Sequence, residues 1–211
     1  IHGRKDSAIL LDTRDLSYEY LYIDPSRVRF VLVNSGVRHS LRESGYNDRR
    51  MECESALALL RGLGAKIDHL CDLSPVDFMP LGPSLPPLEL RRARHAITEN
   101  ARTLEFLRRM RSGDFSAAGE LLYASHASLR DDFEVSIDQM DRLVEWAGGV
   151  EGAYGSRMMG GGFGGCTVTM VDAPSAGRFA AEIALKFQEE YGAPPGVLEC
   201  AIGDGVSELI R

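Results

Sequence analysis

Five of the six positions from 160 to 165 are glycine, and this run constrains the fold more than any other part of the sequence. Glycine loses more backbone freedom on folding than any other residue. A run of glycines is therefore favoured only where the backbone takes positive φ or comes very close to another group. Two interpretations follow, a loop that faces a ligand and a glycine-rich hairpin packed against a neighbouring element.

The run formally contains G-x-G-x-x-G at Gly160, Gly162 and Gly165. A dinucleotide-binding fingerprint requires a strand before the glycines and a helix after them. Here the apolar segment CTVTMV, residues 166–171, predicts a strand after the glycines, so the Rossmann interpretation is rejected. The sequence also contains no GxxxxGK[ST], so it has no Walker loop.

The composition argues against nucleic-acid-binding and membrane proteins. The 211 residues include 24 basic and 31 acidic side chains, a net charge of −7, and nothing resembles a basic patch. We expect no nucleic-acid partner and no membrane partner, because both require clustered positive charge or a long apolar span. The four cysteines form no CxxC pair, so no metal site is predicted and a reducing, cytoplasmic location fits.

Periodicity predicts strands and helices without regular βαβ alternation, which indicates an α+β fold. Strands are expected at 8–12, 28–33, 166–171 and 197–202, and helices at 44–60, 88–111, 115–129, 136–147 and 173–191. In the first helix Ser44 is the expected N-cap and Met51, Ala56 and Leu60 the expected apolar stripe. The proline-rich stretch 73–88 is interpreted as a surface crossing within one domain of residues 1–211.

A polar cluster, NSGVRHSL at 34–41 followed by GYNDRR at 45–50, comes between the predicted strand 28–33 and the first predicted helix. Binding groups collect at strand ends and helix starts. Arg38 is a candidate phosphate ligand because its charge is permanent, and Tyr46 offers a flat face and one hydroxyl to a sugar. The alternatives are that Arg38 pairs with a surface acid and that His39 is structural.

The segment SHASLRDDFEVS, residues 125–136, places Ser125, His126 and Asp131 close in sequence. Such a set suggests a hydrolase triad, but sequence proximity is not triad geometry and no GxSxG elbow is present. A polar network that closes the end of a helix is the preferred interpretation.

Together these segments resemble the galactokinase family of the GHMP kinase superfamily. The matching stretches are VNSGVRHSL with GYNDRR (33–50), RARHAITEN (92–100), SHASLRDDFEVS (125–136) and GSRMMGGGFGGCTV (155–168). The resemblance implies a GHMP-kinase C-terminal-type domain, a mostly antiparallel sheet packed against several helices. It also implies transfer of the γ-phosphoryl group of MgATP to the anomeric hydroxyl of D-galactose.

The resemblance assigns site residues one by one. Tyr46 matches a tyrosine that lines the sugar site, and Arg38 matches an arginine near the reacting phosphate and the catalytic base. The glycine run matches the superfamily's third motif, which borders the active-site cleft, at Gly160, Gly161, Gly162, Gly164 and Gly165. Phosphoryl transfer depends mainly on positioning and on stabilisation of negative charge, which suits these residue types.

The sequence also departs from the family pattern. It contains no segment resembling GxMDQ, which carries the family's catalytic aspartate, no GLSSSA-like phosphate loop and no galactose signature. We therefore expect this chain to be the C-terminal part of a galactokinase, inactive alone, with its own N-terminal portion as partner and as the main source of Mg²⁺ ligands. Gly36 and Gly45 also replace residues more usual in the family.

Two other functions remain open at the level of sequence. One is a kinase for a related sugar such as N-acetylgalactosamine, since the discriminating contacts are expected outside this chain. The other is a non-catalytic sensor that binds galactose and ATP and docks on a regulator. A packing module with no site is disfavoured by Tyr46 and the glycine run.

Overall fold

The computed structural model describes residues 2–37 and 42–206, without the side chains of residues 42–44. The strands are β1 (Ser7–Leu11), β2 (Tyr18–Tyr22), β3 (Val28–Asn34), β4 (Ala153–Met159), β5 (Cys166–Asp172) and β6 (Gly196–Cys200). The helices are α1 (Arg42–Gly62), α2 (Pro75–Phe78), α3 (Pro87–Ser112), α4 (Phe115–Asp131), α5 (Asp138–Gly148) and α6 (Ala176–Tyr191).

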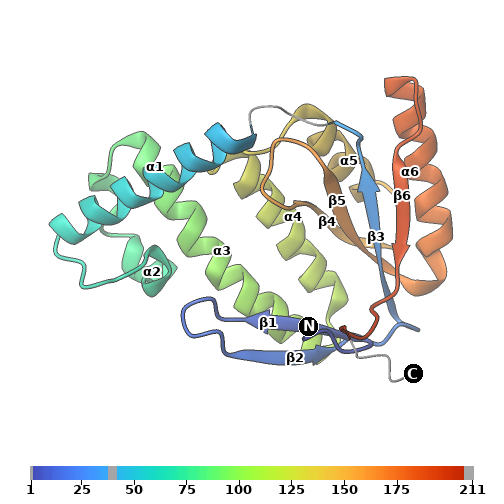
Figure 1. Cartoon of the computed structure of the whole chain (residues 1–211), viewed down its shortest axis with the longest axis horizontal. Helices are drawn as coiled ribbons and strands as arrows, with labels where there is room; N and C mark the ends of the chain where they lie inside the picture. The colour runs from blue at the N-terminus through green and yellow to red at the C-terminus, as the bar shows by residue number, and fades with distance from the viewer. Residues whose placement is uncertain (1, 38–41, 207–211) are drawn as a thin grey trace.

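Four strands form an antiparallel sheet in the order β4-β5-β3-β6 (Figure 1). In its centre β3 runs from Val28 opposite Asp172 to Asn34 opposite Cys166. The hairpin β1–β2 is a separate two-stranded sheet and lies below the helices in Figure 1. The predicted α+β fold, an antiparallel sheet packed against several helices, is confirmed.

The helices cover the sheet in two groups. Helices α1, α3 and α4 pack in that order, and α4 lies along the edge strand β4 (Figure 1). Helices α5 and α6 bury Leu143, Phe179 and Ile183 in one apolar cluster with Val31 and Val33 of β3. Alternation along β3 places Val28 in a second cluster, with apolar side chains of α3 and α4.

The proline-rich stretch 73–88 is not a bare loop. It contains α2 and a single 3₁₀ turn, Gly82–Ser84. Ser74 caps α2 by accepting a hydrogen bond from the amide of Asp77 at 3.1 Å. Phe78 and Leu85 are buried in a third apolar cluster with Ile97 of α3 and Leu60 of α1.

Helix α4 and strand β4 meet backbone to backbone. A Cβ atom on Gly119 would lie 1.9 Å from the carbonyl oxygen of Tyr154, and one on Gly155 would lie 2.0 Å from the carbonyl oxygen of Gly119. The register of β4 shifts between Ala153 and Gly155, which places a bulge at this contact. Two facing glycines therefore set the distance between helix and sheet.

Several element predictions were wrong in detail. The segment 44–60 extends to Arg42–Gly62, so Ser44 lies in the first turn of α1 rather than at its cap. Met51 is exposed, although Ala56 and Leu60 are fully buried as expected. Strands β2 and β4 were missed, because β4 includes a bulge at Gly155 and β2 is half exposed.

Candidate functional site

The end of β3 and the glycine loop, residues 160–165, meet although they are far apart in the sequence. The loop connects β4 to β5, and β5 pairs with β3 so that Asn34 lies opposite Cys166. The amide and the hydroxyl of Ser35 both donate to the carbonyl oxygen of Gly165, at 3.0 and 3.1 Å. Since the loop joins two antiparallel strands, the rejection of a Rossmann fingerprint is confirmed.

Two of the five glycines are required by packing. Gly164 has φ +121°, and a Cβ atom there would lie 2.6 Å from the carbonyl oxygen of Val37. A Cβ atom on Gly162 would lie 2.6 Å from the Cβ atom of Val135. At these two positions the glycines are explained by packing of the hairpin against neighbouring residues.

The other three glycines face open space. A Cβ atom on Gly160, Gly161 or Gly165 would meet no atom within 4 Å. Positive φ values at Gly160 (+84°) and Gly165 (+92°) account for glycine there, whereas neither packing nor positive φ explains the lack of a side chain at Gly161. An exposed backbone of this kind lets N–H groups approach a ligand closely, as anion-binding loops do.

Phe163 is the one residue of the loop with a side chain, and it contacts two neighbouring segments. Its amide donates to the carbonyl oxygen of Val135 at 2.7 Å, and its φ of +60° is unusual for a residue with a side chain. Its ring lies against the start of α1, where a Cβ atom on Gly45 would come within 2.6 Å of the ring. Gly45 is therefore part of the site architecture, although sequence analysis noted it only as a departure from the family pattern.

Tyr46 follows Gly45 in α1, and its side chain is 62% exposed. The contact between Gly45 and Phe163 thus brings the predicted sugar residue to the same region as the glycine loop. Arg38 lies outside the described residues, in the stretch between Val37 and α1. Ser35, which precedes Arg38 in the sequence, donates to Gly165 of the loop. Gly45, which follows Arg38, lies against the ring of Phe163.

The segment 125–136 does not form a catalytic triad. Ser125 donates to Glu99 at 2.6 Å rather than to His126. The Nδ1 atom of His126 accepts from the amide of Met158 at 3.2 Å, so the proton of the neutral ring is on Nε2, 3.0 Å from Asp141. These bonds tie α4 to its neighbours α3, β4 and α5.

A second buried histidine lies on α3. The Nδ1 atom of His95 is 3.0 Å from the hydroxyl oxygen of Ser128, and its ring stacks on Phe133 at 4.3 Å between centroids. Burial lowers the pKa of His95 to about 4, so the ring is neutral near pH 7. This residue anchors the segment that leads to Val135 rather than performing proton transfer.

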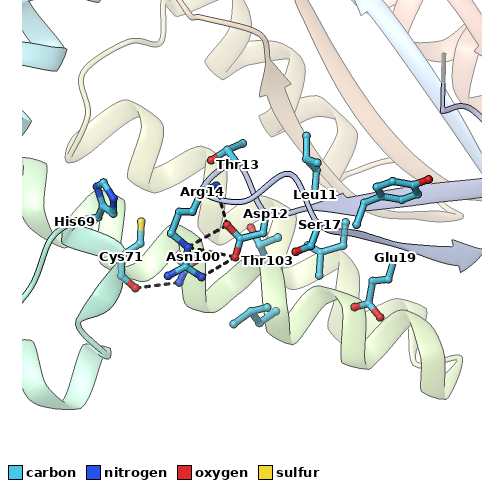
Figure 2. Close-up of a pocket in the computed structure, with 13 residues that line it drawn as sticks. Leu11, Asp12, Thr13, Arg14, Ser17, Glu19, His69, Cys71, Asn100 and Thr103 are labelled. Atoms are coloured by element: carbon cyan, nitrogen blue, oxygen red, sulfur yellow. Dashed lines mark hydrogen bonds and ion pairs between the residues drawn. The ribbon is translucent and has the colours of Figure 1, made fainter.

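A cavity lies elsewhere, between the β1–β2 hairpin and α3 (Figure 2). Its volume is about 1000 Å³. Arg14 and Asp12 line it and form an ion pair at 2.6 Å. On its helical side Asn100 donates to the carbonyl oxygen of Cys71 at 3.3 Å. Tyr46 and the five glycines of the loop do not line this cavity.

Within residues 2–37 and 42–206, no group of three or more His, Cys, Asp or Glu side chains is arranged to hold a metal ion. No helix among these residues is long and apolar enough to cross a membrane.

Comparison with known proteins shows what the chain is similar to. Residues 103–189 match the family described as GHMP kinases C terminal. The chain is 44% identical over 205 residues to a galactokinase of Chloroflexus aggregans, covering 97% of this chain and 52% of that protein. A galactokinase of Clostridium acetobutylicum is 39% identical over 208 residues, with 98% and 53% covered.

Solved structures show the same similarity to galactokinases. The structure of Lactococcus lactis galactokinase complexed with galactose superimposes with a TM-score of 0.92 at 34% identity, over 99% of this chain and 54% of that one. L. major mevalonate kinase in complex with R-mevalonate gives a TM-score of 0.54 at 16% identity, a similarity of fold alone. The sequence resemblance is thus confirmed, and the chain spans about half the length of the curated relatives it matches.

Proposed function

We propose that the chain is the C-terminal half of a galactokinase, since residues 103–189 match the family described as GHMP kinases C terminal. The whole enzyme transfers the γ-phosphoryl group of ATP to the anomeric hydroxyl of D-galactose. The observation that carries the proposal is the similarity to galactokinases along 97–99% of the chain, including one solved with galactose. The meeting of Tyr46's helix with the glycine loop supports it.

The proposed roles follow the chemistry of each side chain. Tyr46, exposed at the start of α1, contributes to the galactose site through its ring and hydroxyl. Arg38 stabilises the negative charge of the transferring phosphoryl group, a task that suits a permanent cation with several donors. Gly160, Gly161 and Gly165 leave open space beside the loop for the substrates, while Gly162 and Gly164 hold the loop in shape.

The N-terminal portion of the enzyme is the proposed partner of this half. The β1–β2 hairpin supports this proposal, because in the described structure it pairs with no other strand. It exposes the large apolar side chains of Leu11, Tyr18 and Tyr22. Two-stranded sheets are marginally stable in water, and a cover over these side chains would stabilise this one.

Magnesium chemistry is assigned mainly to that partner portion. Among the described residues, no group of three or more His, Cys, Asp or Glu side chains is placed to hold a metal ion. When bound with ATP, the metal neutralises charge on the phosphates. The cytoplasm is the proposed location, since the cysteines Cys53, Cys71, Cys166 and Cys200 are all free in the structure.

The test is galactose-dependent ADP formation by the natural full-length protein and by its Arg38→Ala variant. Loss of charge stabilisation should lower kcat at least 100-fold, by analogy with removal of other transition-state donors. Arg50→Ala is the matched control, because Arg50 pairs with Glu54 on the exposed side of α1. Its kcat should stay within two-fold of the original.

The proposal fails if the full-length protein binds galactose and ATP without turnover, which is the behaviour of a sensor. Preference for N-acetylgalactosamine over galactose by kcat/KM would overturn the substrate assignment. An Arg38→Ala enzyme as active as the Arg50→Ala control would overturn the role of Arg38.

A further inference from the structure

One buried side chain of α3 connects both parts of the candidate site. The side chain of Arg92 is 1% exposed, which is rare for arginine. Its Nε atom donates to Glu52 on α1 at 2.5 Å, and Nη2 donates to Glu134 at 2.6 Å. The remaining nitrogen, Nη1, donates to the carbonyl oxygen of Asp132 at 2.5 Å.

The two ends of this network lead to the site. Glu52 lies on the same helix as Tyr46, and Arg49 also pairs with it at 2.7 Å. At the other end, Glu134 immediately precedes Val135, whose carbonyl oxygen accepts from Phe163 and whose side chain contacts Gly162. Three hydrogen bonds from one guanidinium thus connect α1 to the glycine loop.

Backbone conformation at Glu134 indicates that this segment is held in place. Its φ is +55°, a left-handed conformation that is unfavourable for a residue with a side chain. Such a conformation persists only where surrounding contacts determine it. The hydrogen bond from Arg92 lowers the pKa of Glu134, so the carboxylate that receives it is ionised near pH 7.

Stability alone does not account for the network. Replacing a buried ion pair by apolar side chains of similar volume is often neutral or stabilising. A guanidinium fork does, however, fix several acceptors in one geometry, which an apolar contact cannot do. The arrangement is therefore better suited to holding a shape than to raising the free energy of unfolding.

We propose that Arg92 is a positioning residue, which joins α1 to residues 132–135 and so holds the glycine loop in its working conformation. The part of this inference that concerns catalysis rests on the proposed galactokinase function. Arg92 touches no substrate in this account and acts through Glu134, Val135 and Phe163. A loop released from this support keeps its sequence but loses the geometry that phosphoryl transfer requires.

Hydrogen–deuterium exchange of the natural full-length protein tests the structural part, with Glu134→Ala as the variant. Glu134 is 44% exposed, so its truncation removes one arm of the network without opening a large cavity. Peptides covering residues 158–166 should exchange at least five-fold faster, while peptides of β3 keep their rate. Glu134 also pairs with Arg91 at 3.4 Å, so Arg91→Ala, which removes only that partner, is the control and should change neither.

Kinetics of the same variants test the catalytic part. Glu134→Ala should lower kcat about ten-fold and change the KM for galactose less than two-fold. Glu134→Gln should restore most of both properties, because its amide oxygen still accepts from Arg92.

Three results would overturn the inference. One is unchanged loop exchange in Glu134→Ala, and another is equal acceleration in the loop and in β3, which indicates general destabilisation. The third is faster loop exchange with unchanged kcat in an active enzyme. If the protein is not a galactokinase, exchange still decides whether Arg92 holds the loop, so the two proposals fail separately.

Discussion

At the scale of single residues, the glycine run serves two different purposes. Gly162 and Gly164 are required because neighbouring atoms occupy the space of a Cβ atom, whereas Gly160, Gly161 and Gly165 have free space around them. The sequence showed the run but not this division. The division depends on Val37 and Val135, which come from distant parts of the chain.

Alanine substitution at Gly161 and Gly164 separates the two purposes. Gly164→Ala should lose about 2–4 kcal/mol of unfolding free energy, because it combines a positive φ with overpacking. Gly161→Ala should change stability by less than about 0.5 kcal/mol, as for other uncrowded surface sites. It should nevertheless lower kcat about ten-fold in the full-length enzyme, since its methyl group would occupy the open face.

Urea unfolding and steady-state kinetics of both variants check this prediction. Equal destabilisation by the two substitutions would contradict the division, and a fully active Gly161→Ala enzyme would contradict a role for the open face.

His95 should make stability depend on pH. The unfolded chain protonates this histidine below about pH 6.5, whereas the folded protein does so only near pH 4. The unfolded state therefore binds more protons between these values, and stability falls as the pH is lowered through this range. The full effect amounts to about 3 kcal/mol.

The measurement is urea unfolding at pH 7, 6 and 5 for His95→Gln and for the control His2→Gln. The first variant should show a shallower dependence on pH, and the second should match the original protein. The same steep dependence in His95→Gln would show that other groups, such as His126, cause it.

At the scale of elements, local periodicity predicted what local forces determine. Helix α3 was expected at 88–111 and runs Pro87–Ser112, because apolar side chains recur along it and Gly113 ends it in a left-handed conformation. Strand β4 was not predicted because its alternation is interrupted by a bulge at Gly155, where the strand contacts α4. Gly45 was likewise set aside, since only the folded structure shows the ring of Phe163 against it.

The close contact between α4 and β4 predicts that a side chain at Gly119 destabilises the protein. Gly119→Ala should lose about 3 kcal/mol or more of unfolding free energy, because the added methyl group meets backbone atoms that cannot rotate away. Gly62→Ala at the end of α1 is the matched control. No atom lies within 4 Å of its Cβ position, so it should be neutral or stabilise by up to about 1 kcal/mol.

Thermal unfolding of both variants provides the measurement. A Gly119→Ala protein as stable as Gly62→Ala would mean that α4 and β4 do not approach as closely as described.

At the scale of the whole molecule, the chain brings together one side of a proposed active site. The glycine loop, Phe163 and the start of α1 form a braced unit, and Arg92 connects it to α3. The β1–β2 hairpin leaves the apolar side chains of Leu11, Tyr18 and Tyr22 exposed. The family resemblance assigns the catalytic aspartate and the main phosphate loop to the other half of the enzyme.

The central claim is that this chain supplies one half of a two-part galactokinase site. Galactose-dependent ADP formation, measured in parallel for the isolated chain and for the natural full-length protein at equal concentration, tests it most directly. The full-length protein should turn over galactose and the chain alone should show background rates, because removing positioning and charge stabilisation together abolishes most of the catalysis. Galactose-dependent turnover by the isolated chain would contradict it.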